Sequence, residues 1–227
     1  MSKLPYVVFD INETLFDLDS LTPHFVRIFG DGNIMREWFA QLILYSEALT
    51  LADDYIPFGE LAGAVLKMVA TVHERDVSDA DIVEVKAAIG AMPPHPDVKS
   101  GLAKLRNAGF RLFALTNNPR ETCIRQLERG GILDFFEQTF SIDDTARRYK
   151  PAREAYRAVE QALQVPPSQL CLVACHPWDT LGAVAAGWHG AVLLRRGNAP
   201  LDVGGQPCVI ALNLDDVADG LIRRFGN

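Results

Sequence analysis

The later half of the chain alternates short apolar runs with segments of helical spacing, and this alternation restricts the fold more than any other feature. A repeated strand–helix–strand pattern is typical of a parallel sheet with helices on both faces. Strands are expected at residues 111–115, 139–142, 170–174, 191–194 and, more weakly, 208–211. Helices are expected near residues 98–108, 120–129, 152–163, 182–187 and 214–224. The sequence therefore predicts an α/β fold with a doubly wound parallel sheet.

One more apolar run, residues 6–9, lies near the N-terminus and stops at Asp10. Its length and β-branched content are typical of a strand buried on both faces. Asp10 would then lie at the carboxyl edge of the sheet, where open α/β folds bind ligands. The alternative is that Asp10 only caps the following turn, as aspartate often does. On its own, this strand leaves both interpretations open.

Between this strand and the alternating half, residues 22–90 show only helical patterning. Ser78 and Asp81 have the form of a helix start, and the proline-rich residues 92–96 are unsuited to a helix interior. We therefore expect about four helices to interrupt the α/β pattern. The predicted domains are a Rossmann-like core at residues 1–17 and 94–227 and an inserted helical cap at residues 18–93.

Composition argues against several other classes of protein. The 227 residues are 48% hydrophobic and 22% charged, which suits a soluble globular protein with a proper core. The formal net charge of −7, without a long basic cluster, does not favour nucleic acid or an anionic membrane as a partner. The N-terminal residues lack the apolar stretch of a signal peptide, and no stretch approaches a membrane span. Four cysteines without paired metal-site spacing favour reduced thiols and a cytoplasmic location.

Three later motifs are expected at the same edge of the sheet as Asp10. They are Thr116-Asn117, Lys150-Pro151 and a late acid, Asp179. The order of the blocks, Asp-x-x-x-Thr, Thr-Asn, Lys-Pro and a late Asp, resembles the haloacid dehalogenase superfamily. The resemblance covers almost the whole chain and implies the same layout of a core with an inserted cap.

A carboxylate at a strand end can attack an electrophilic carbon or phosphorus and form a covalent intermediate. It must be ionised, and a cation such as Lys150 lowers the pKa of a neighbouring Asp10. Thr14 and Thr116 offer hydroxyl donors to the nucleophile or a bound anion, and Asn117 offers an amide donor. The alternative is that Lys150 is an exposed lysine before a helix and that the others are ordinary turn residues.

Two positions depart from the phosphatases of this superfamily. The resemblance implies an acid two residues after the nucleophile and a magnesium-binding aspartate at the end of a later strand. These positions carry Asn12, which neither supplies nor takes a proton at neutral pH, and Cys175, whose thiol suits magnesium poorly. A dehalogenase needs neither group, because a halide leaves without a proton and a substrate with one carboxylate needs no metal clamp.

The match is closest to the type II L-2-haloacid dehalogenases of the superfamily. This resemblance implies that Asp10 displaces the halide at carbon 2 and that Asp179 activates the water that hydrolyses the resulting ester. It also implies a site formed by Asp10, Thr14, Thr116, Asn117, Lys150, Tyr156 and Asp179.

Other positions differ from that family. Ala174 and His176 stand where a serine and an asparagine are expected, and Phe39 follows Trp38 where the family has the arginine credited with holding the halide. Phe39 is either a wall of the pocket or a plain core residue, and His176 is either a donor to the halide or a satisfied loop histidine. The other residues expected to bind substrate or to wall the pocket are Ile11, Asn12, Tyr45 and Trp178.

The sequence therefore predicts a metal-independent hydrolytic dehalogenase of a small 2-haloalkanoic acid, acting through an aspartyl ester and without a cofactor. The expected partners are this carboxylic acid and its halide, and the resemblance suggests a homodimer. Two alternatives stay open. One is a magnesium-dependent phosphatase of a small phosphate ester, and the other is a non-catalytic member that binds a small anion.

Overall fold

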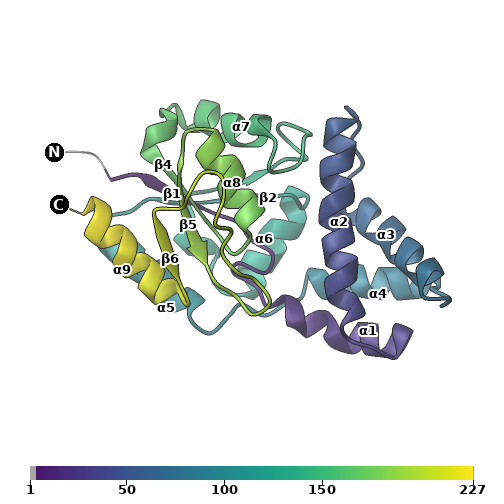
Figure 1. Ribbon diagram of the computed structural model, residues 1–227. Coiled ribbons are helices and arrows are strands. Elements are labelled where there is room, and N and C mark those ends of the chain that lie inside the picture. The colour runs from purple at the N-terminus through teal and green to yellow at the C-terminus, as the bar shows by residue number, and fades with distance from the viewer. Residues whose placement is uncertain (1–3, 227) are drawn as a thin grey trace.

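A computed structural model describes residues 4–226. The strands are β1 (Tyr6–Phe9), β2 (Leu112–Thr116), β3 (Gln138–Ser141), β4 (Leu170–Ala174), β5 (His189–Leu193) and β6 (Val209–Ala211). Within the described range they form one six-stranded sheet in the order β3-β2-β1-β4-β5-β6, with every pairing parallel (Figure 1). The doubly wound α/β fold predicted from the alternation is confirmed.

β1 lies at the centre of the sheet because its side chains can be buried on both faces. Residues 7–9 have no exposed surface, as expected where helices cover both sides of a parallel sheet. Phe9 is in register with Ala114 of β2 and with Val173 of β4. Asp10, the next residue, therefore leaves the sheet at its carboxyl edge, at the point where the strand order reverses. Open α/β sheets bind their ligands at this point.

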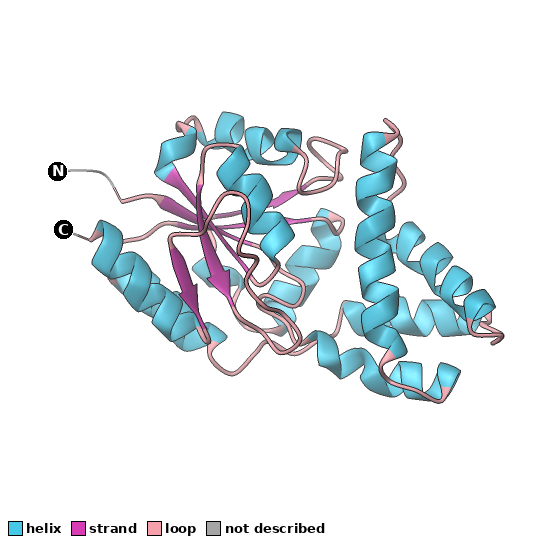
Figure 2. Ribbon diagram, viewed as in Figure 1, coloured by secondary structure: helices cyan, strands magenta, loops and turns pink. Residues whose placement is uncertain are grey.

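Helices cover both faces of the sheet (Figure 2). They are α5 (Val98–Asn107), α6 (Arg120–Arg129), α7 (Arg153–Leu163), α8 (Pro177–Ala185) and α9 (Leu214–Phe225). α5 packs against α9 on one face, and α7 packs against α8 on the other. The close packing of α5 on α9 requires a glycine, because a Cβ on Gly101 would lie 2.4 Å from Leu214 Cγ.

The segment between β1 and α5 is helical, as predicted. It contains a short 3-10 helix η1 (Leu18–Leu21) and the helices α1 (Thr22–Phe29), α2 (Ile34–Leu51), α3 (Phe58–Val72) and α4 (Asp79–Ile89). We call this segment the helical insertion; its helices lie together beside the sheet in Figure 1. Trp38 of α2 is buried against α3, where its indole donates to the Ala62 backbone oxygen at 3.1 Å. The domain boundaries at residues 17/18 and 93/94 stay a prediction.

Two of the differences from the predicted bounds change where site residues lie. β2 ends at Thr116 rather than at residue 115, so Thr116 belongs to the strand. α8 begins at Pro177, five residues before the predicted start, because proline fixes φ at a helical value and is favoured in the first turn. Asp179 therefore lies in the first turn of α8.

No helix within residues 4–226 is long and apolar enough to span a membrane. The cytoplasmic location and the homodimer stay predictions.

Candidate active site

The motifs meet at the carboxyl edge of the sheet around one buried ammonium group. Lys150 Nζ donates to Asp10 Oδ1 at 2.8 Å and to Asp179 Oδ2 at 2.6 Å. It also donates to the backbone oxygen of Leu115 in β2 at 3.2 Å. All three charged side chains are buried, so the ammonium compensates both carboxylates for the water they have lost, and they compensate it. The structure thus brings together three charged residues that the sequence analysis selected separately.

Asp10 is held as an ionised carboxylate. Its Oδ2 accepts a hydrogen bond from Thr14 Oγ1 at 2.6 Å, and that hydroxyl accepts one from the Cys175 backbone N–H at 2.9 Å. Burial opposes ionisation, but Lys150 and His176 outweigh it and hold the pKa of Asp10 well below its usual value. An ionised, partly desolvated carboxylate can act as a nucleophile.

The pKa of Asp179 is shifted in the opposite direction from that of Asp10. Tyr156 Oη donates to Asp179 Oδ1 at 2.7 Å, and Lys150 binds the other oxygen. Burial and the charge of Asp10 raise the pKa of Asp179, although Lys150 opposes the rise. This close approach requires a glycine in α8, because a Cβ on Gly182 would lie 2.6 Å from the Tyr156 hydroxyl. The two carboxylates thus have pKa values that are pushed apart, which suits a nucleophile and a base.

Two side chains at the end of β2 have donors without a partner among residues 4–226, and these donors are available to an anion. Thr116 Oγ1 accepts the Asn118 backbone N–H at 3.1 Å, which leaves its own hydrogen to donate. Asn117 Oδ1 accepts the Lys150 backbone N–H at 3.3 Å, which leaves its Nδ2 group to donate. Thr116 and Asn117 both line a cavity that includes Asp10.

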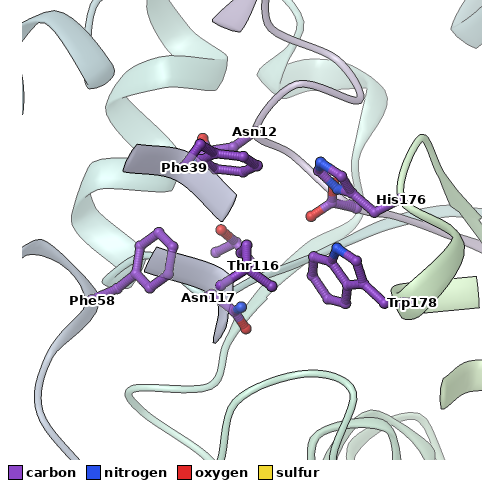
Figure 3. A pocket seen from close by; sticks show the side chains of 9 residues that line it. Asn12, Phe39, Phe58, Thr116, Asn117, His176 and Trp178 are labelled. Atoms are coloured by element: carbon purple, nitrogen blue, oxygen red, sulfur yellow. The ribbon is translucent and has the colours of Figure 1, made fainter. Parts of the chain in front are cut away.

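This cavity is small. Its volume of about 20 Å³ is room for only a few water-sized groups at most. In Figure 3, Phe58 and Trp178 lie on opposite sides of Thr116 and Asn117. The lining residues are Asp10, Asn12, Phe39, Ile43, Phe58, Thr116, Asn117, His176 and Trp178. The core supplies the polar groups, while α2 and α3 supply apolar walls.

Ile11 and Tyr45, which were expected to bind substrate or to wall the pocket, do not line the cavity. Ile11 is fully buried away from it. Tyr45 is 40% exposed on α2, which corrects the prediction that it walls the pocket. Ile43 takes that place, because it lies four residues after Phe39 on the same helix face, whereas Tyr45 lies six residues after it. The helical spacing from Phe39 could therefore have predicted Ile43, whereas no pattern in the sequence indicates Phe58.

Glu13 is a charged residue of the site that the sequence analysis did not select. It is buried, and its Oε2 lies 2.8 Å from His176 Nε2. A glutamate in a turn is ordinarily exposed, so its type gave no signal. Only its place beside Thr14 in the first motif pointed to it.

Asp10, Cys175 and His176 have potential metal-ligand atoms within 4.8 Å of one another. This set does not fit magnesium, which prefers hard oxygen ligands in octahedral geometry. Both oxygens of Asp10 are already bound, one by Lys150 and one by Thr14. Burial raises the pKa of the Cys175 thiol, which keeps it protonated. The chemistry of the site is therefore derived from its side chains alone.

Known proteins match this chain over most of its length. The family model described as haloacid dehalogenase-like hydrolase matches residues 5–187. The chain belongs to the haloacid dehalogenase-like hydrolases. This hydrolase is 29% identical to haloacetate dehalogenase H-2 of Moraxella sp. (strain B), over 91% of this chain and 93% of that protein. It is 30% identical to the plasmid phosphoglycolate phosphatase of Cupriavidus necator, over 75% of this chain and 78% of that protein.

Solved structures show the same fold. L-2-haloacid dehalogenase from Xanthobacter autotrophicus superposes with a TM-score of 0.88 at 23% identity, and the match covers 98% of this hydrolase and 100% of that chain. The resemblance to the superfamily and the prediction of a hydrolytic enzyme are thus confirmed.

Proposed function

We propose that this hydrolase is a metal-independent dehalogenase that acts on a small 2-haloalkanoic acid through an ester at Asp10. The observation that supports this most is the cluster of Asp10, Lys150 and Asp179, which arranges a nucleophile and a base around one ammonium group. The positions that would carry the acid and the metal ligand of a phosphoryl transfer hold Asn12 and Cys175 instead.

In the first step, a carboxylate oxygen of Asp10 attacks carbon 2 of the acid, and the carbon–halogen bond breaks as the new carbon–oxygen bond forms. The halide leaves with the bonding electron pair and needs no proton. Lys150 and Thr14 fix the position of the nucleophile, and the free donors of Thr116 and Asn117 bind the substrate carboxylate. Attack from the side opposite the halide inverts carbon 2.

In the second step, water attacks the carboxyl carbon of the Asp10 ester and gives a proton to Asp179. That proton passes to the departing oxygen of the 2-hydroxy acid, which comes from Asp10, and the second proton of the water leaves the regenerated Asp10 carboxyl for solvent. Asp179 Oδ2 accepts from Lys150 and Oδ1 accepts from Tyr156, so water reaches Asp179 when one of these contacts opens. The raised pKa of Asp179 makes it a stronger base than an ordinary aspartate.

The size of the cavity supports the smallest 2-halo acids as substrates. A cavity of about 20 Å³ has little free space, so a longer acid must displace more of the wall side chains than a haloacetate does. The walls formed by Phe39, Phe58 and Trp178 offer no charge to a longer, polar substrate. The Moraxella relative is named a haloacetate dehalogenase. We therefore expect haloacetates to react faster than 2-halo acids with longer chains.

A magnesium-dependent phosphatase is the second candidate, because the Cupriavidus relative is named a phosphoglycolate phosphatase. The surroundings of Asn12 argue against it. Its Oδ1 accepts hydrogen bonds from Asn118 Nδ2 and Gln126 Nε2, both at 3.2 Å. An amide held in this way cannot protonate a leaving group at neutral pH.

A halide-release assay separates the two functions. The substrates are fluoro-, chloro- and bromoacetate and both enantiomers of 2-chloropropanoate, each with excess EDTA or with magnesium, beside p-nitrophenyl phosphate. The proposal expects halide release that EDTA does not reduce. Hydrolysis of the phosphate ester that strictly requires magnesium, without halide release, would overturn it.

A further inference from the structure

The buried pair of Glu13 and His176 lies beside the nucleophile but has no part in ester formation or hydrolysis as proposed. His176 Nε2 lies 2.8 Å from Glu13 Oε2, and the exposed fractions of the two residues are 5% and 2%. The imidazole ring stacks on Trp178 with centroids 5.1 Å apart, and the centroid of Phe39 lies 5.6 Å from it. These contacts fix the orientation of the ring at the cavity wall (Figure 3).

The other ring nitrogen faces the nucleophile. His176 Nδ1 lies 3.5 Å from Asp10 Oδ2 and has no hydrogen-bond partner among residues 4–226. A neutral imidazole carries a hydrogen on one nitrogen only. If Nε2 carries the hydrogen, the lone pair of Nδ1 faces the carboxylate of Asp10. If Nδ1 carries it, the lone pair of Nε2 faces the carboxylate of Glu13. Only the imidazolium presents a hydrogen to both.

Arg36 and Asn198 stabilise the ionised form of Glu13. Arg36 of α2 forms an ion pair with the Glu13 carboxylate, and Asn198 Nδ2 donates to Glu13 Oε1 at 3.0 Å. Burial opposes ionisation, but His176 and Arg36 outweigh it and lower the pKa of Glu13. The backbone of Glu13 has a φ of 63°, a left-handed conformation that is uncommon outside glycine. The fold therefore places this carboxylate despite local backbone strain.

The charged groups around His176 favour its positive form. Burial lowers the pKa of His176, whereas the carboxylates of Asp10 and Glu13 raise it. The Cys175 thiol is itself protonated, because burial raises its pKa, so the negative charge comes from the two carboxylates. The nearest cations lie behind these carboxylates: Lys150 binds the other oxygen of Asp10, and Arg36 binds Glu13.

We propose that Glu13 holds His176 as an imidazolium and that the Nδ1–H of this ring binds an anion of the reaction at the cavity wall. Phe39, which lines the same cavity, is uncharged and cannot bind the anion in this way. The anion is the departing halide or the substrate carboxylate, and the inference rests on the proposed function. Ester formation neutralises Asp10 and moves its negative charge to the halide, so Nδ1–H is then free for a new anion. His176 contacts the anion, and Glu13 is a positioning residue that acts through His176.

Glu13→Gln tests the link between the two residues. The variant keeps an oxygen that can face Nε2 but removes the charge. A group with a raised pKa stays protonated until the pH passes that pKa, so the imidazolium of the variant should be lost at lower pH. We expect the basic limb of kcat/KM to move to lower pH, with a fall of roughly tenfold or more at pH 8. An unchanged basic limb would overturn the proposal.

Glu37→Gln is the matched control. Glu37 Oε2 lies 2.8 Å from His73 Nε2 in the helical insertion, so the same substitution breaks a second Glu–His pair that does not line the cavity. The pH profile of this variant should equal that of the wild type. A basic limb shifted equally in both variants would contradict a specific role for Glu13.

The protonation state of His176 can be read without turnover. In ¹⁵N NMR spectra of the resting enzyme at pH 7.5, assigned with His176→Gln, both ring nitrogens of His176 should carry hydrogen in the wild type. They should show the neutral form in Glu13→Gln. A neutral His176 in the wild type would overturn this proposal even if the enzyme releases halide. A protonated His176 in an enzyme that releases no halide would instead count against the proposed function alone.

Calorimetric titration of Asp10→Asn, whose neutral side chain stands in for the esterified Asp10, with sodium bromide and sodium acetate identifies the anion. A charge-assisted hydrogen bond to Nδ1–H should make the double variant Asp10→Asn/His176→Gln bind one of them roughly tenfold more weakly than Asp10→Asn alone. A loss confined to bromide assigns the halide, and a loss confined to acetate assigns the substrate carboxylate. Unchanged affinities for both anions would overturn the proposal.

Discussion

At the scale of single residues, Lys150 decides whether two buried carboxylates can coexist as anions. It donates to Asp10 at 2.8 Å and to Asp179 at 2.6 Å. Lys150→Met would leave two like charges buried together, so one of them must bind a proton. The proton goes to Asp179, whose pKa is already raised, and Asp10 loses the cation that offsets its burial and holds its oxygen in place, so we expect kcat/KM for halide release to fall by about 10³-fold or more at pH 7.

Lys104→Met is the matched control for this change. Lys104 also lies between two aspartates, at 3.7 Å from Asp215 and 3.0 Å from Asp219, but on the partly exposed surface of α5 and α9. Its loss should leave kcat/KM at the wild-type value. Wild-type turnover in Lys150→Met would contradict the role given to the buried ammonium.

Tyr156 changes the pKa of Asp179, the proposed base. Its hydroxyl donates to Asp179 Oδ1 at 2.7 Å and lowers the pKa of that carboxyl, against the rise that burial causes. Tyr156→Phe should therefore raise the pKa of Asp179 further. Asp179 must be ionised to take a proton, so activity is lost as the pH falls through this pKa. The acid limb of kcat should move to higher pH, which a profile from about pH 4 to 8 would show. An unmoved limb would show that Asp179 does not act as the base.

The site residues within the motifs could be predicted because their positions relative to the predicted strands indicate where they lie in the fold. Asp10 and Thr116 end or follow parallel strands, and the ends of neighbouring parallel strands share one edge. The pairing of Glu13 with His176 could not be predicted in this way. It depends on the left-handed backbone at Glu13 and on the orientation of one imidazole, and neither is visible in residue types.

At the scale of elements, α2 joins the helical insertion to the loop that carries the nucleophile. One end of it binds Glu13 through Arg36, and one face of it supplies Phe39 and Ile43 to the cavity. Hydrophobic spacing predicted the helix but not its rotation about its axis. That rotation is set by packing on α3, and it is why Tyr45 points away from the cavity.

Arg36→Ala should weaken the contact between α2 and the loop that carries Asp10 and Glu13. Arg36 pairs with the buried Glu13 and with Asp19 at 2.6 Å, and it donates to the backbone oxygen of Arg196 at 3.2 Å. Its removal leaves Glu13 buried without this cation. We expect the free energy of unfolding in urea to fall by about 1–3 kcal/mol, less than for a fully buried pair because the Arg36 side chain is 34% exposed.

Arg27→Ala provides the comparison, because Arg27 pairs with Asp81 and Glu84 on the exposed surface of the same insertion. Exposed ion pairs contribute little to stability, so this variant should unfold at nearly the wild-type urea concentration. Equal destabilisation in the two variants would contradict the role given to the Arg36–Glu13 pair.

At the scale of the whole molecule, the order of the motifs along the chain was enough to predict where they meet. The reversal of strand order beside β1 brings Lys150 and Asp179 to Asp10. The walls of the cavity were less predictable, because they depend on how the insertion docks over the sheet edge. Phe58 of α3 lines the cavity for that reason alone, and no local pattern marks it.

The central claim is that Asp10 attacks the substrate and that water attacks the Asp10 ester. A single turnover in ¹⁸O-labelled water, with enzyme in excess over bromoacetate, tests it most directly. Mass spectrometry of the peptide that contains Asp10 and of the hydroxy acid then locates the label. The account predicts that the label enters the Asp10 carboxylate and that the product oxygen is unlabelled. Label in the product of the first turnover, with Asp10 unlabelled, would mean direct attack by water and would contradict the account.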